Sequence, residues 1–155
     1  MKNQEIQVNE IWNNEKQDEL NQFILLHSKK QTEERKLANE LLSIQYKMED
    51  YIRNENDNEE VLRVIDFVKM YLKTLDITQK KLANLFEMKD SNLYKYLVGE
   101  RKLNSNLVLK LSYFSHTKPE YWIRVQVKNE LMELKKEKRN SDYYAKYDYR
   151  NLVGA

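Results

Sequence analysis

Apolar residues recur at helical spacing before residue 54. Between residues 32 and 52, alternating steps of four and three residues join five of them: Leu37, Leu41, Ile44, Met48 and Tyr51. This spacing predicts one face of an amphipathic helix that begins between residues 31 and 34. A lone helix must bury such a face. It can pack on the second half of the chain, on Ile11, Trp12 and residues 23–26, or on another chain, so internal packing and dimerisation or partner binding both stay open.

Five further helical segments follow the stretch 54–60, which contains no apolar residue and reads as a linker. We expect helices over 61–75, 79–87, 92–98 and 106–114, and a fifth that begins near Pro119. The side chains that we expect to cap the last four are Thr78, Asp90 or Ser91, Asn104 or Ser105, and Thr117. These segments predict an all-α fold with an acidic N-terminal helical extension over 1–58, a compact five-helix domain over 59–135 and a Tyr-rich tail over 136–155.

Composition supports this prediction and adds a charge asymmetry. The chain of 155 residues has only two glycines and one proline, too few for many hairpin turns, and it has no cysteine. Residues 1–60 carry 8 Lys and Arg against 14 Asp and Glu, whereas residues 61–155 carry 19 against 11. The net charges are therefore −6 and +8. A basic second half suggests a nucleic-acid or phosphate partner, although solvated helix faces also produce such runs.

The segment from Thr78 to Val98 has the pattern of a helix-turn-helix. Two short helices follow each other closely, and a small residue, Ala83, stands where the second would cross the first. Apolar residues expected between them are Leu82, Phe86, Met88, Leu93 and Leu97. In such a motif the second helix enters the DNA major groove. Gly99 would end that helix in the left-handed conformation and turn the chain back toward the phosphates.

The polar residues of this segment have the chemistry of DNA contacts. Side chains of the Asn, Lys and Ser type read base edges, while basic, amide and hydroxyl side chains bind phosphates. We expect Gln79 and the basic exit of the motif to meet phosphates, and Tyr94 to reach sugar or phosphate. The candidate DNA-binding residues are Thr78, Gln79, Lys89, Ser91, Asn92, Tyr94, Lys95, Arg101, Lys102 and Asn104.

Residues 60–130 resemble the Xre (phage Cro/repressor-like) helix-turn-helix family. Gln79, Leu82-Ala83 and Val98-Gly99-Glu100-Arg101 match its general pattern, and Thr117, Tyr121, Trp122 and Gln126 match the continuation of HigA-type antitoxins. The resemblance implies a repressor-like domain in a homodimer that binds operator DNA and neutralises a partner toxin, a ribonuclease. Two residues depart from the family: Glu87 replaces a usual Gly in the turn, and Asp90 replaces a basic or small polar residue. His116 stands where Gly is common.

Other functions receive little support from the sequence. It lacks a Gly-rich phosphate loop and the G-x-S-x-G and H-E-x-x-H motifs, so we expect no enzyme, cofactor or metal site. It also lacks an N-terminal signal pattern or a long apolar run, which predicts a cytoplasmic protein without a membrane partner. Two rivals stay open: a protein-interaction module with the helix-turn-helix as scaffold, favoured by Glu87 and Asp90, and a plain Xre-type regulator without a toxin.

Overall fold

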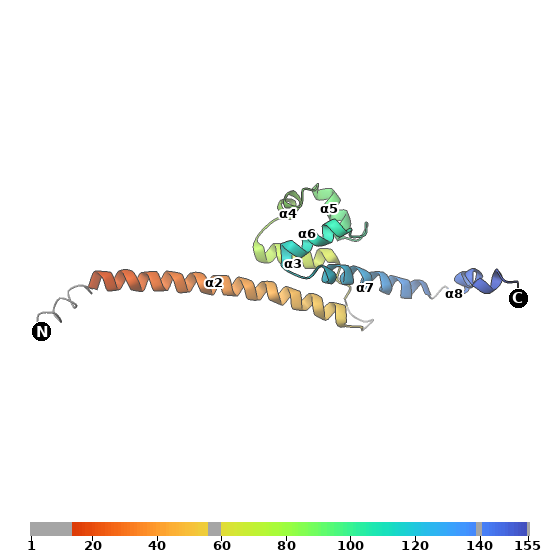
Figure 1. The fold of residues 1–155 in the computed structure, drawn as a ribbon, viewed down its shortest axis with the longest axis horizontal. Coiled ribbons are helices and arrows are strands. Elements are labelled where there is room, and N and C mark those ends of the chain that lie inside the picture. Colours follow the sequence, from red (N-terminus) through yellow and green to blue (C-terminus); the bar gives the residue numbers. More distant parts are fainter. Residues whose placement is uncertain (1–13, 56–59, 139–140, 155) are drawn as a thin grey trace, which may run out of the picture. The chain divides into compact units, whose positions relative to one another are not determined.

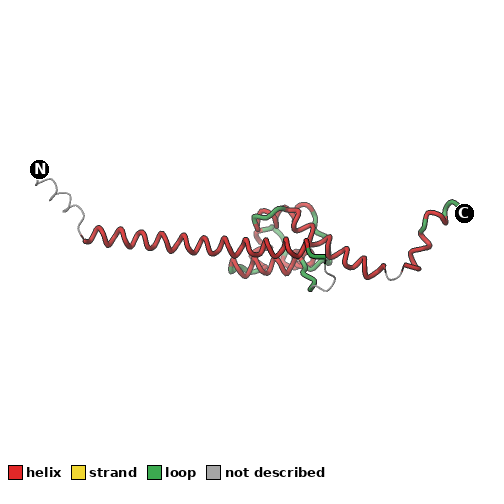
Figure 2. Tube along the Cα trace, turned by 90° about the horizontal axis from the view of Figure 1, so that it is seen from below, coloured by secondary structure: helices red, strands yellow, loops and turns green. Residues whose placement is uncertain are grey.

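The protein is all-α in the parts that the structure describes. The computed structural model describes residues 14–55, 60–138 and 141–154, and these form seven α-helices, two short 3-10 helices and no strand (Figure 2). The elements are α2 (Asn14–Arg53), α3 (Val64–Leu75), α4 (Gln79–Leu85), α5 (Asp90–Leu97), α6 (Ser105–Ser115), α7 (Pro119–Glu137), α8 (Ser141–Tyr144), η2 (Ala145–Tyr147) and η3 (Tyr149–Asn151). The expectations for Ile11, Trp12 and most of the 54–60 linker lie outside the described residues.

Helix α2 is longer than the sequence pattern predicted. It begins at Asn14 rather than between residues 31 and 34 and runs without interruption to Arg53. No glycine or proline interrupts this segment, while Glu15 in the first turn and Arg53 in the last complement the helix dipole. The start was misplaced because the apolar pattern marks where a helix packs, not where it begins.

The chain divides into two compact units, 1–40 and 41–155. The described part of the first unit is the α2 segment 14–40, whose side chains are all exposed. The last turns of α2 belong to the second unit, where Ile44, Met48 and Tyr51 are buried in its hydrophobic core. This division lies ahead of the boundary at residue 58 that the linker composition suggested. Of the alternatives left open for the apolar face, packing on the second half of the chain is the one observed for these three residues.

The core of the second unit is built around α3, which contacts both α5 and α7 (Figure 1). Helix α3 begins at Val64, three residues later than predicted, because the Asp66 carboxylate accepts a hydrogen bond from the Arg63 backbone N–H at 2.8 Å. Asp76, with φ 53°, ends it in the left-handed conformation. Six α3 side chains are buried: Val64, Ile65, Phe67, Val68, Tyr71 and Leu72.

Helices α6 and α7 pack on each other and close the core. The expected cap of α6 is confirmed, since the Asn104 side chain accepts from the Leu107 N–H at 2.8 Å, and His116 makes the left-handed end with φ 54°. The cap predicted for α7 is wrong: Lys118 holds that position, and Pro119 is the first helical residue. The Thr117 hydroxyl is used inside the core instead, where it accepts from the indole N–H of fully buried Trp122 at 3.0 Å.

The C-terminal segment forms short helices whose side chains, except that of half-buried Asp148, are exposed. Tyr143, Tyr144 and Tyr147 contact one another through their rings, with centroids 5.0–6.3 Å apart. Helix α7 continues to Glu137, two residues into the region expected to be a tail. None of the helices described for this chain has the length and apolar character that a membrane span needs.

Candidate nucleic-acid interface

Helices α4 and α5 form a packed pair joined by a short turn (Figure 1). The predicted cap of α4 is confirmed, because the Thr78 hydroxyl accepts from the Lys81 N–H at 3.2 Å. Leu82, Ala83, Phe86 and Leu93 are at most 3% exposed, so apolar packing holds the two helices together. The small side chain at Ala83 allows this close approach.

The turn between the helices depends on a left-handed residue. Glu87 has φ 58°, at the position where the resemblance leads one to expect glycine. Its N–H donates to the Asn84 carbonyl at 3.1 Å, and the Met88 N–H donates to the Ala83 carbonyl at 2.9 Å. These bonds satisfy carbonyls at the end of α4 and direct the chain into α5. Glu87 therefore takes the backbone conformation of a glycine at the steric cost of its Cβ.

The start of α5 differs from the prediction. Neither Asp90 nor Ser91 is the cap: Lys89 holds that position and makes no side-chain bond to the helix, while Asp90 is the first helical residue. The Asp90 carboxylate instead accepts a hydrogen bond from the Gln79 side-chain amide at 2.8 Å. The first residues of α4 and α5 are thereby joined. A carboxylate in the first turn also favours the helix dipole.

Helix α5 presents a polar outer face. Leu93 and Leu97 are at most 1% exposed and define its inner side. Ser91 and Lys95 are four residues apart, so they share the side opposite these two leucines. Asn92 and Lys95 are half-buried, whereas Ser91 and Tyr94 are exposed. The structure thus brings four of the predicted DNA-binding residues together on or beside one helix face: Ser91, Asn92, Tyr94 and Lys95.

The exit from α5 is a left-handed turn at Gly99, as predicted. Gly99 has φ 90°, and a Cβ there would meet no atom within 4 Å, so conformation rather than space requires glycine. The following Arg101 N–H donates to the Lys95 carbonyl at 3.1 Å. The Arg101 guanidinium lies 5.8 Å from the centre of the Tyr96 ring, within cation–π range. The turn therefore fixes the basic residue after the glycine to α5.

The remaining predicted DNA-binding residues differ in how far their side chains are already engaged by other groups of the protein. The Lys102 ammonium is 3.9 Å from a Glu130 carboxylate oxygen, but its side chain is 81% exposed. The Asn104 side-chain oxygen is engaged as the cap of α6, which leaves its amide N–H groups for a phosphate. Lys89 is exposed just before α5. These residues border the α5 face rather than lie on it.

Two exposed lysines in this region were not predicted. Lys80 and Lys81 stand in the first turn of α4, directly after its cap. With them, residues 78–104 carry six basic and three acidic side chains, a net charge of +3. The signal that could have identified them is the pair of lysines in "TQKK", directly before the apolar positions of the first helix.

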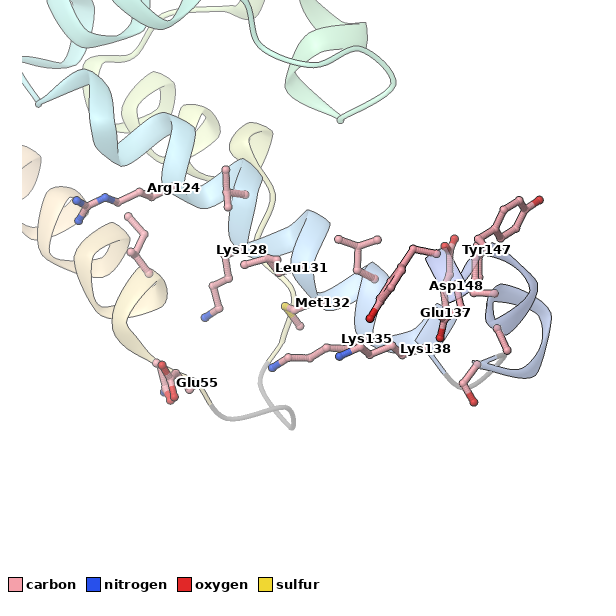
Figure 3. Close-up of a pocket in the computed structure, with 18 of the residues that line it drawn as sticks. Glu55, Arg124, Lys128, Leu131, Met132, Lys135, Glu137, Lys138, Tyr147 and Asp148 are labelled. Carbon is pink, nitrogen blue, oxygen red and sulfur yellow. The ribbon is translucent and has the colours of Figure 1, made fainter. Parts of the chain in front are cut away.

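The second unit also carries a groove that is not lined by α4 or α5. A groove of about 1530 Å³ follows the outer half of α7 toward the C-terminal segment (Figure 3). Val127, Leu131 and Leu134 give it an apolar floor, and they are 41%, 52% and 57% exposed. Lys135 and Lys138 stand along it. The groove therefore combines an apolar floor with basic side chains along its length.

No protein-family model, curated protein or solved structure matches this chain. Among residues 14–55, 60–138 and 141–154, no group of three or more His, Cys, Asp or Glu side chains could hold a metal ion.

Proposed function

We propose that this protein binds DNA as a transcriptional repressor of the Xre type, with α4 and α5 as a helix-turn-helix and α5 as the helix that enters the major groove. One observation carries the proposal. The face of α5 opposite its buried leucines groups Ser91, Asn92 and Lys95, which are side chains of the kind that read base edges. The packed partner helix and the left-handed turn at Gly99 fit the same motif.

Phosphates would be bound by the basic residues that border this face. Lys80, Lys81, Lys89, Arg101 and Lys102 are all exposed and come from the two ends of the helix pair. Contacts of this kind fix the register of a protein on DNA and supply most of its salt-dependent affinity. The base-reading residues would then act from a fixed position.

The negative charge of Asp90, which Gln79 binds, lowers this affinity. Asp90 places a negative charge at the start of α5, where a phosphate would otherwise gain from the helix dipole. Asp90→Asn keeps an oxygen that can accept from Gln79 and removes the charge. We therefore expect Asp90→Asn to bind DNA more tightly than the wild type, with the same sequence preference.

Titration of the DNA upstream of the protein's own gene tests the proposal. In fluorescence anisotropy, Asn92→Ala and Lys95→Ala should each cost about 1–3 kcal/mol of binding free energy where the residue contacts a base. Lys47→Ala is the matched control, because it removes an exposed lysine from α2 rather than from the helix pair. Absence of binding at low salt, or equal effects of all three substitutions, would contradict the proposal.

A salt series separates the two kinds of contact. Each lost phosphate contact should lower the slope of log affinity against log salt by about one and weaken all sequences alike. We expect this of Lys81→Ala and Arg101→Ala. Asn92→Ala should leave the slope unchanged and relax sequence preference. If Asn92→Ala lowered the slope instead, α5 would not be the reading helix.

We further propose that the repressor is the antitoxin of a toxin–antitoxin pair. This part is supported by the HigA-like continuation at Thr117, Tyr121, Trp122 and Gln126. Its test is co-expression with a short basic reading frame next to the gene. The antitoxin should co-purify with that product and restore growth. If the product of the neighbouring reading frame were not toxic by itself, this protein would instead be a plain Xre-type regulator without a toxin.

The alternative is a protein-interaction module in which the helix-turn-helix is only a scaffold. The acidic residues Glu87 and Asp90 favour it, as does the apolar groove along α7. A fragment of residues 41–155 discriminates, because it keeps the core residues of α2 and lacks the first unit. Full DNA binding with lost capture of a partner would assign partner binding to residues 1–40. If neither the fragment nor the full chain bound DNA, the protein-interaction alternative would be favoured.

A further inference from the structure

The first unit carries an exposed face whose residues repeat with a coiled-coil period. Along α2, steps of three and four residues join Leu20, Phe23, His27, Lys30, Glu34, Leu37 and Leu41. The same steps lead on to Ile44, Met48 and Tyr51, which are buried in the core of the second unit. The heptad face is therefore continuous, but among the residues that the structure describes only its last part is covered.

The uncovered part is too apolar for a solvated surface. Leu20, Phe23 and Leu37 on the face are 43%, 67% and 38% exposed, and Ile24 and Leu26 beside it are 50% and 69% exposed. The Phe23 and His27 rings are stacked, with centroids 6.1 Å apart and planes 3° from parallel. The side chains of this stretch thus already share one surface, and an apolar helix face of this kind needs a partner.

Two charges in the middle of the face restrict what that partner can be. Lys30 and Glu34 occupy consecutive core positions of the heptad pattern, and both are exposed. Polar residues at core positions fix the register and orientation of coiled coils. A suitable partner helix must present an acid opposite Lys30 and a base opposite Glu34.

A second copy of this helix, running antiparallel, meets that requirement. We propose that two copies pair through residues 23–41 of α2 in an isologous antiparallel coiled coil, with the twofold axis beside Thr32. In this register Lys30 faces Glu34 of the second copy, and Glu34 faces its Lys30. The two opposite-charge contacts follow from one pair of residues, because the symmetry repeats each contact.

The apolar layers fit the same register. Phe23 faces Leu41 of the second copy, and His27 faces its Leu37. Each layer joins the two different core positions of the heptad, as antiparallel packing needs. The paired segment rises about 27 Å. It ends at Leu41 because the next core residue, Ile44, is only 5% exposed and belongs to the second unit.

Other pairings of the same face are worse. A shift by one heptad places Phe23 against Glu34 and His27 against Lys30. A parallel pair in register stacks Lys30 on Lys30 and Glu34 on Glu34, since each residue then faces its own copy. The proposed register has one unfavourable contact, Glu33 facing Glu33 at the flank of the axis, and this contact supplies a test.

Cysteine cross-linking of the full chain tests the pairing directly, because the native sequence has no cysteine. His27→Cys/Leu37→Cys should form a covalent dimer under mild oxidation. Within one chain the two positions are about 15 Å apart along the helix, too far for a disulfide. His27→Cys alone should stay monomeric on a non-reducing gel. A cross-link of His27→Cys alone would show a parallel pair and overturn the proposal.

Charge changes give an independent measurement by sedimentation equilibrium. Lys30→Glu and Glu34→Lys should each weaken association about tenfold, because each places two like-charge pairs across the interface. The double variant Lys30→Glu/Glu34→Lys should restore it. Glu33→Gln should tighten association severalfold. A wild-type chain that stays monomeric at high concentration, or a double variant as weak as the singles, would overturn the proposal.

Circular dichroism of each variant checks that α2 remains helical, which these exposed positions should permit. The pairing does not rest on DNA binding. If the protein were a monomer that still bound DNA, the coiled-coil proposal would be refuted and the proposed function would stand. If it were a dimer that bound no DNA, the proposed function would be refuted and the coiled coil would stand.

Discussion

Glu87 offers the sharpest test of the α4–α5 turn because one substitution changes two separable properties. Its φ of 58° is left-handed, which costs a residue with a Cβ roughly 1–2 kcal/mol. Glycine removes this cost but loses about 0.5–1 kcal/mol through greater freedom of the unfolded chain. Glu87→Gly should therefore raise the free energy of unfolding by about 0.5–1 kcal/mol. It also removes a negative charge from the turn that precedes α5.

Glu87→Gln separates the two effects, since it removes the charge and keeps the strained backbone. In urea denaturation, Glu87→Gly should shift the midpoint upward by about 0.2–1 M, given slopes of about 1–3 kcal/mol/M. Glu87→Gln should leave the midpoint near that of the wild type. In DNA titration both variants should bind more tightly than the wild type and to a similar degree. A glycine variant less stable than the wild type would refute the strain argument, and unchanged DNA binding in both would refute the charge argument.

Three further predictions concern single side chains. Gly99→Val should lower stability by about 1–2 kcal/mol and reduce DNA affinity. Gly99→Asn should recover part of both, since a Cβ at this position meets no atom within 4 Å. Unchanged stability and affinity in Gly99→Val would refute the assignment of Gly99 as the helix end. Tyr71→Phe should raise the free energy of unfolding by about 1 kcal/mol in thermal melts, because the Tyr71 hydroxyl is buried without a partner among the described residues. Burial also raises the pKa of this hydroxyl to about 12. A destabilised variant would reveal a hydrogen bond to that hydroxyl. Tyr121→Phe should be less stable than the wild type at pH 7, with the difference narrowing in acid. The Tyr121 hydroxyl donates to the Glu49 carboxylate at 2.7 Å and lowers the pKa of Glu49 below 4.5, so this contribution is present above pH 4.5 and lost as pH falls through the lower folded pKa; a pH-independent difference would contradict it.

The fold of the second unit was predictable because its helix ends carry local chemical signals. The caps at Thr78 and Asn104 and the left-handed ends at Gly99 and His116 were each visible as a residue type in a position. The start of α2 carried no such signal. Its first turns are exposed on all sides, so no buried face marks them, and nothing in the sequence distinguishes a solvated helix there from a linker.

The wrong caps share a physical cause. Asp90 and Thr117 have side chains that commonly cap helices, but each is bound by another polar side chain instead. Gln79 reaches Asp90 from eleven residues away, and the Trp122 indole reaches Thr117 from the first turns of α7. Contacts of this kind depend on the packing of helices on one another, which residue type and local spacing do not encode.

The Gln79–Asp90 bond changes how the departures from the family pattern should be interpreted. In the sequence, Asp90 is a departure from the Xre pattern that favours the scaffold alternative. In the structure it accepts a bond from Gln79 and joins the starts of α4 and α5. A substitution of Asp90 can therefore have two opposite effects on DNA binding. It removes the repulsion between the carboxylate and DNA phosphates, and it can also remove the hydrogen bond that holds Gln79. Asp90→Ala and Asp90→Asn should consequently differ: both remove the charge, but only the asparagine can keep Gln79 in place. If the two bound DNA equally well, the bond would have no part in presenting α5.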